Sequence, residues 1–179
     1  MFVRLVFILG GMLFAVIVAV LIVAAARPSD YRVERSVVLN APPEKVYTLI
    51  EDVRRWPDWS MDEMKDPTLK RQFFGPARGL GAGFDWSGAA HSGKGRATIT
   101  EAVPPSRLVV KVQVEEPYRD KSMLEIRLSP HEQGTQLQWA ASGMMSYFTK
   151  VTTTFTTMDA VMGPRVEGSL AKLKLLAEG

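Results

Sequence analysis

The chain of 179 residues contains no cysteine. Disulfide bonds, thiolate zinc sites and a cysteine nucleophile are therefore excluded. Histidine is almost as scarce, with only His91 and His131 present. Both fall in stretches typical of turns, at different places in the order of elements, so we expect solvated histidines that form neither a shared metal site nor a proton relay. The sequence thus predicts no metal, no cofactor and no catalytic residue.

A strong excess of one charge sign is also missing. The 22 lysines and arginines nearly balance 19 acidic residues, which gives a net charge of +3. Two of the 22, Arg4 and Arg27, flank an apolar segment, and without them 20 basic residues face 19 acidic ones, a net of +1. No stripe of basic and aromatic residues is present that could follow a phosphate backbone. We therefore predict no nucleic-acid partner.

The chain does have one long apolar run, Leu5–Ala26, without a charged side chain. As a helix rising about 1.5 Å per residue it would span roughly 33 Å, enough for a hydrocarbon core of about 30 Å. We interpret residues 1–27 as a transmembrane anchor that makes this a single-pass protein of the cell membrane. The alternative is a signal sequence with a cleavage site at Ala24–Ala26, although the apolar core of such peptides is typically about 7–15 residues.

The charges beside this segment favour different orientations. Three arginines come after it, at Arg27, Arg32 and Arg35, whereas Arg4 precedes it. This excess favours a cytoplasmic domain, but a short N-terminal tail before a long apolar run is also typical of anchors that export the domain attached to them. The side of the soluble part is left open.

Small residues recur at every fourth position of the apolar run, at Gly11, Ala15 and Ala19. A face of small side chains lets two membrane helices approach closely. We expect weak dimerisation through this face, with the frequent use of Ala and Gly in membrane helices as the alternative explanation.

The middle of the chain alternates apolar and polar residues in three successive runs. The apolar positions are Val110, Val112, Val114, Leu124, Ile126, Leu128, Leu137 and Trp139. A period of two predicts antiparallel strands with one covered face and one solvated face. Together with four earlier strand patterns, this predicts seven strands.

A helical pattern from Met158 to Ala177 is the candidate cover for the apolar face of these strands. Gly163–Pro164 lies inside this pattern. Because proline removes a helical hydrogen bond, we expect either a helix that begins at Pro164 or one that begins at Asp159 and bends there.

Several short stretches, and their order, carry a resemblance to a known family. They are Ala41–Tyr47, Asp52–Trp59, Gly75–Gly83, Gly93–Glu101, Pro104–Pro105, Gly134–Trp139 and Met158–Leu173. These stretches resemble polyketide cyclase/dehydrase members of the START-like superfamily, also called SRPBCC or helix-grip proteins, over residues 35–178. The resemblance implies an α+β helix-grip domain at 35–179, in which a curved seven-stranded antiparallel sheet wraps around the long C-terminal helix. Residues 28–34 would form a linker and the start of the first strand.

The resemblance also implies a hydrophobic cavity between sheet and helix, and no shared catalytic residue. Tryptophan supplies bulk and one N–H donor, and methionine fits irregular ligands, so we expect large apolar side chains to line the cavity. The candidates are Trp59, Phe84, Trp86, Val112, Ile126, Trp139, Met144, Phe148, Met158 and Met162. An ordinary packed core is the alternative for each of them.

The charged residues that could lie near a cavity mouth are Asp85, Arg96 and Glu101. We expect them to be paired or solvated, because a carboxylate serving as an acid or base would need an apolar pocket.

We predict a membrane-anchored protein that binds a hydrophobic small molecule or lipid. A polyketide cyclase/dehydratase-like enzyme and a membrane-tethered protein-interaction module are the alternatives. An enzyme requires polar groups converging on the cavity, whereas an interaction module requires an exposed apolar patch.

Overall fold

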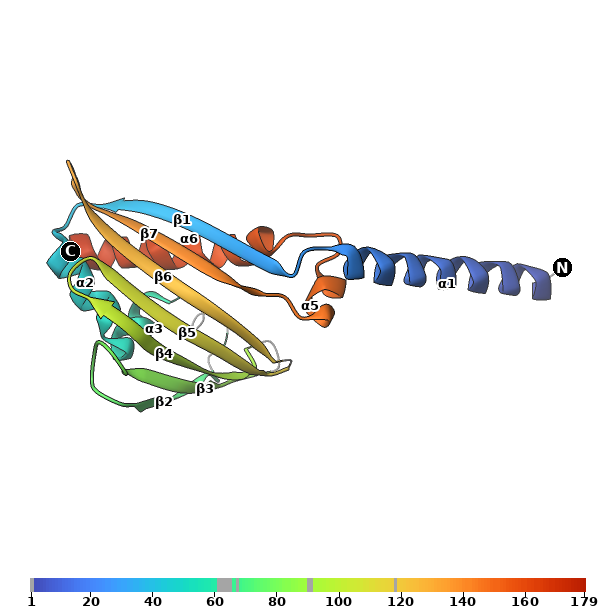
Figure 1. Cartoon of the computed structure of the whole chain (residues 1–179), viewed down its shortest axis with the longest axis horizontal. Helices are drawn as coiled ribbons and strands as arrows, with labels where there is room; N and C mark the ends of the chain where they lie inside the picture. Colours follow the sequence, from blue (N-terminus) through green and yellow to red (C-terminus); the bar gives the residue numbers. More distant parts are fainter. Residues whose placement is uncertain (1, 61–65, 67, 90–91, 118) are drawn as a thin grey trace.

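The structure is a computed structural model that describes residues 2–60, 66, 68–89, 92–117 and 119–179. The helices are α1 (Phe2–Ala26), α2 (Pro43–Glu51), the short 3-10 helix η1 (Val53–Arg55), α3 (Trp56–Trp59), α5 (Tyr147–Thr152) and α6 (Met158–Glu178). The strands are β1 (Asp30–Leu39), β2 (Lys70–Phe74), β3 (Gly83–Ser87), β4 (Lys94–Val103), β5 (Arg107–Glu116), β6 (Asp120–His131) and β7 (Gly134–Met144). Figure 1 shows α1 extending away from the remaining elements as a separate rod.

The strands form one seven-stranded antiparallel sheet in the order β1-β7-β6-β5-β4-β3-β2. The predicted α+β fold is thereby confirmed. The first strand pairs with the last, with Val37 opposite Leu137 and Arg35 opposite Trp139. This pairing places β1 at one edge of the sheet, where α6 runs along it (Figure 1).

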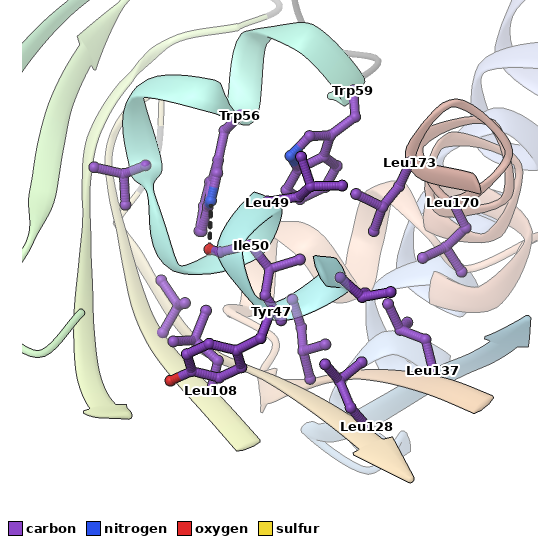
Figure 2. Packing of buried hydrophobic residues seen from close by; sticks show 14 of the residues in the cluster. Tyr47, Leu49, Ile50, Trp56, Trp59, Leu108, Leu128, Leu137, Leu170 and Leu173 are labelled. Atoms are coloured by element: carbon purple, nitrogen blue, oxygen red, sulfur yellow. Dashed lines mark hydrogen bonds between the residues drawn. The ribbon is translucent and has the colours of Figure 1, made fainter. Parts of the chain in front are cut away.

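The side chains that the alternation of the middle strands predicts to face inward do face inward. Val110, Ile126, Leu128 and Leu137 are buried. The helices α2 and α3 close this part of the core, and Figure 2 shows their side chains meeting those of the sheet and α6 in one cluster. Inside it, the indole Nε1 of Trp56 donates to the backbone oxygen of Ile50 at 2.9 Å.

The long helix α6 passes through its internal proline. It begins at Met158, where the side chain of Thr157 accepts from the backbone N–H of Ala160 at 3.1 Å, and it ends at Glu178. The expectation of a helix starting at Pro164 is therefore wrong. Proline removes one hydrogen bond, but the helix buries a stripe of residues at intervals of three or four on both sides of it: Gly163, Val166, Leu170, Leu173 and Ala177. Packing of this stripe overrides the local preference for a break.

An inward arginine of β1 fastens the first half of α6 to the sheet. Arg35 Nη1 lies 2.7 Å from Asp159 Oδ1, and Arg35 Nε lies 2.6 Å from Glu167 Oε1. These hydrogen bonds raise the pKa of Arg35 and lower that of Asp159. The guanidinium crosses α6 at Gly163, where an added Cβ would lie 2.1 Å from Arg35 Nη2. Any side chain at this position would require the flexible end of Arg35 to move away.

Replacing Gly163 with alanine tests this contact. Helix propensity alone would stabilise the variant by about 1 kcal/mol, but the new methyl group must displace the guanidinium from its carboxylates. We expect Gly163→Ala to be less favourable in the native chain than in an Arg35→Ala background, with a coupling of about 1–2 kcal/mol between the two sites. Denaturant unfolding of all four proteins in detergent measures the coupling, and equal effects in both backgrounds would contradict the proposed contact.

Candidate functional site

The concave face of the sheet is closed at one end and open at the other. Near the end of β1 the inward side chains Leu39, Leu108 and Leu128 are buried. Toward the end nearest α1 the small inward residues Val33, Ala97 and Ala141 are buried, but the larger ones are only half-buried. These are Trp86, Val112, Val114, Leu124 and Trp139. We call this second set the open half of the concave face. Apolar side chains that are partly exposed within a concave surface are typical of ligand sites.

The indole of Trp86 forms one wall of the open half. It lies across Gly95 on the neighbouring strand, where a Cβ would be only 2.3 Å from the ring. Its Nε1 donates to the backbone oxygen of Ser92 at 3.1 Å, so the polar end of the ring is satisfied and its apolar face remains available. A glycine stands at position 95 because a side chain there would collide with the ring of Trp86.

The opposite wall comes from the first turns of α6. Met158 and Met162 are half-buried and precede the buried Val166 at four-residue intervals, so they continue its stripe toward the open half. Methionine side chains adapt to differently shaped apolar groups. The sheet thus offers aromatic and branched apolar groups, and the first turns of α6 offer flexible ones.

Aromatic rings connect the open half with the closed core. The ring centroids of Trp56 and Phe84 are 5.7 Å apart, and those of Phe84 and Trp86 are 6.3 Å apart. Arg71, opposite Trp86 in the pairing of β2 with β3, places its guanidinium carbon 5.2 Å from the centroid of Phe84. This inward cation was missed by sequence reasoning, although Arg71 and Phe73 alternate with polar neighbours as inward residues do.

Two buried donors of the closed core have no hydrogen-bond partner within the described residues, the Tyr47 hydroxyl and Trp59 Nε1. Burial, followed by the nearby charge of Glu51, raises the pKa of Tyr47. Leaving such a donor unpaired costs about 1–3 kcal/mol. In Figure 2 the two groups point to different parts of the cluster, so they do not form a single polar site.

The ten candidate side chains fall into three groups. Trp59, Phe84 and Ile126 are packed in the closed core. The open half or the start of α6 holds five of them: Trp86, Val112, Trp139, Met158 and Met162. Met144 and Phe148 instead lie on the surface.

The two surface residues have different reasons for their placement. Met144 points outward because Gly143 takes the inward position, where its Cβ would meet the Tyr31 ring. Phe148 lies on α5, which packs against α1 and not under the sheet. That any of the ten candidates contacts a ligand stays a prediction.

Two polar hollows lie on the convex face, opposite α6. One, of about 280 Å³, includes Arg32, Glu34 and Gln138 in its lining, and the other, of about 380 Å³, includes Arg107, Arg127 and Ser129. Charged and amide side chains dominate both linings, so neither hollow suits an apolar ligand. The open half of the concave face is the candidate site.

The charged residues near the sheet edge are paired, as the sequence predicts. Arg96 Nε lies 2.6 Å from Asp85 Oδ1, and this hydrogen bond lowers the pKa of Asp85. Arg107 Nη1 lies 2.6 Å from Glu101 Oε1. Both carboxylates thus lie in solvent-accessible pairs and not in the apolar pocket that a carboxylate serving as an acid or base would need.

The two histidines do not add a site among the described residues. His131 ends β6 in an exposed position, and its Nδ1 accepts from the backbone N–H of Gln133 at 3.2 Å. His91 lies outside the described residues. Within the described part of the chain, histidine, aspartate and glutamate form no group of three or more that could hold a metal ion.

The match to a family model covers residues 30–178, and the family is described as polyketide cyclase/dehydrase and lipid transport. The chain belongs to this family, as the resemblance of its short stretches implied. A comparison with curated proteins finds no match.

Solved structures share the fold at low sequence identity. A protein from Chromobacterium violaceum is 20% identical with a TM-score of 0.59, over 85% of this chain and 99% of that one. A protein from Rhizobium leguminosarum is 15% identical with a TM-score of 0.61, over 85% and 97%. A dimeric protein from Colwellia psychrerythraea is 15% identical with a TM-score of 0.58, over 83% and 96%. These likenesses establish the helix-grip fold.

Truncations at the two ends of α6 distinguish closed from open packing. Leu173 is buried in the closed core, so Leu173→Ala should cost about 2–5 kcal/mol of unfolding free energy. Met162 is half-buried beside the open half, so Met162→Ala should cost clearly less. Denaturant unfolding of the full chain measures both values, and a loss at Met162 equal to that at Leu173 would mean that the open half is packed.

Proposed function

We propose that this protein is a membrane-anchored binder of a hydrophobic small molecule or lipid, which lies against the open half of the concave face. One observation carries the proposal: large apolar inward residues of the sheet, Trp86, Val112, Leu124 and Trp139, remain half-buried beside the closed core. Membership of a family described by lipid transport supports it. A ligand that covered Trp139, Leu124 and Val112 would gain about 25 cal/mol for each Å² of apolar surface removed from water.

The proposed anchor is α1. Its segment Phe7–Ala26 has the length and composition of a membrane-crossing helix, with a mean hydropathy of 3.0. Only 6% of that segment is buried by the rest of the chain, so packing within the domain does not account for its apolar side chains. A bilayer would cover them.

Contacts at the end of α1 favour a retained anchor over a removed signal sequence. The hydroxyl of Tyr147 donates to the backbone oxygen of Leu21 at 3.0 Å, and Lys150 Nζ donates to that of Ala25 at 3.4 Å. Cleavage after Ala26 would remove both acceptors. The small-residue face of Gly11, Ala15 and Ala19 is exposed along the same helix and would be available to a second copy within the membrane.

Filling the open half should block binding. Val112→Phe adds bulk on the inward side of β5, and we expect it to weaken binding of a fluorescent fatty-acid probe at least tenfold, or about 1.4 kcal/mol. Met123→Phe is the matched control, because Met123 is exposed on the outward side of the adjacent strand, paired with Lys111. Energy transfer from tryptophan to the probe reports binding. Equal affinities for the two variants, or no binding by the native chain, would refute the proposed site.

The anchor predicts how the protein fractionates. We expect the full chain to stay in the membrane fraction through an alkaline carbonate wash, because about 20 apolar residues in α1 cross the hydrocarbon core. A double variant with lysine at Leu13 and Ile17 should lose this retention, since each charge near the bilayer centre costs about 2.5–3.5 kcal/mol on insertion. Recovery of a soluble native chain that starts at Arg27 would establish the signal-sequence alternative.

A further inference from the structure

The segment after the last strand leaves large apolar side chains in solvent. Phe155 is 89% exposed, Phe148 57% and Tyr147 51%, and Met144 beside them is 69% exposed. We call the three rings the α5 aromatic face. Clustered apolar exposure of this kind marks a surface that meets another apolar phase or partner.

This segment is fastened to the C-terminal end of α1. Lys150, only 7% exposed, donates from Nζ to the backbone oxygen of Arg27 at 2.6 Å and contacts the oxygen of Ala25 and the hydroxyl of Ser29, each at 3.4 Å. A lysine in this position satisfies carbonyl groups at a helix end and complements the negative end of the helix dipole.

Further contacts fix the position of α5 along the axis of α1. The guanidinium of Arg27 donates to the backbone oxygens of Thr153 and Thr156. The hydroxyl of Tyr147 donates to the oxygen of Leu21 at 3.0 Å. Figure 1 shows α5 lying against the last turns of α1.

The height of these contacts corresponds to a membrane interface. Leu21 precedes the end of α1 at Ala26 by five residues, which at about 1.5 Å per residue is roughly 7 Å inside the apolar segment. Interfacial helices bury their apolar faces about 5–10 Å into the boundary between headgroups and acyl chains. Tyrosine is also enriched at this level, and the hydrogen bond to the oxygen of Leu21 satisfies the hydroxyl of Tyr147 there.

We propose that the α5 aromatic face is seated in the headgroup region of the bilayer that α1 crosses. The proposal rests on the membrane anchoring proposed above, and its occupant is the lipid surface itself. Phe155 lies three residues before Met158, where α6 begins, so along the chain the seat adjoins the helix turn that carries the two methionines. A lipid could then enter the open half from the interface without first crossing bulk water.

The absence of native cysteine makes the seat testable with single labels. A nitroxide at Phe155→Cys, in the full chain reconstituted into phosphatidylethanolamine–phosphatidylglycerol vesicles, should collide with oxygen dissolved in lipid more than with a water-soluble nickel chelate. Ala15→Cys, within α1, is the lipid reference, and the exposed Ser129→Cys on β6 is the water reference. We expect the collision ratio at position 155 to shift from the value at 129 toward the value at 15.

The references separate failure of the seat from failure of the anchor. A lipid-like value at 15 with a water-like value at 155 overturns the seat and leaves the anchor in place. A water-like value at 15 overturns both. Protection of position 155 from oxygen and nickel alike would place a protein partner on the aromatic face and would also contradict the proposal.

A second variant tests the fastening of α5. Lys150→Met should release α5 from α1 and shift the label at 155 toward the water reference. Lys174→Met is the matched control, because Lys174 Nζ also donates to a backbone oxygen, that of Val38 at 2.9 Å, but lies near the other end of α6. An unchanged ratio in Lys150→Met, with circular dichroism showing a folded domain, would mean that the contact with α1 does not hold the aromatic face in the membrane.

Discussion

The ion pairs of Arg35 with α6 hold the helix at one position on the sheet. That position in turn sets how much of the sheet the helix covers. One planar guanidinium binds two carboxylates, Asp159 and Glu167, that are eight residues apart on the helix. Such a contact restricts both the rotation of α6 and its position along β1, because the donors of the guanidinium have a fixed geometry. The first half of the helix is thereby held at the edge of the sheet, close to Gly163, and the strands further in are left partly uncovered.

As a result, different interactions hold α6 to the sheet at the two ends of the domain. At the closed end, apolar packing among Leu137, Leu170 and Leu173 holds helix to sheet (Figure 2). At the open end, polar contacts to α6 substitute for the apolar packing that a filled interface would provide. Since exposed ion pairs contribute only about 0.2–1 kcal/mol each, the open end is the less stable part of the interface. A site that must admit and release a ligand is drawn from such a region.

The sequence predicted the features that depend on local periodicity. Alternation around Val110, Leu128 and Leu137 located the inward faces of the strands, because a period of two is written into neighbouring residues. It did not predict which inward positions stay half-buried, since this depends on the path of α6 across the sheet. The choice between a break at Pro164 and a helix that continues through it was left open for the same reason: the local rule favours a break, and packing of distant elements overrides it.

Three placements show which positions the sequence pattern could have revealed and which it could not. The outward direction of Met144 follows from continuing the alternation of β7 through Trp139 and Gly143, so parity alone would have found it. Arg35 stands between the inward Val33 and Val37, and an arginine at such a position indicates a buried-side ion pair. The position of Phe148, by contrast, depends on contacts between α5 and α1 across more than a hundred residues, which no local pattern encodes.

The short link between α1 and β1 limits how far the domain can move from the end of α1. Only Arg27, Pro28 and Ser29 separate the two elements, a reach of roughly 11 Å when fully extended. Proline restricts this link further. With α1 in the membrane as proposed above, a domain on so short a link would stay at one leaflet and could not travel with a cargo as a shuttle does. It would act as a stationary receiver, loaded or emptied by its own leaflet or by a carrier that comes to it.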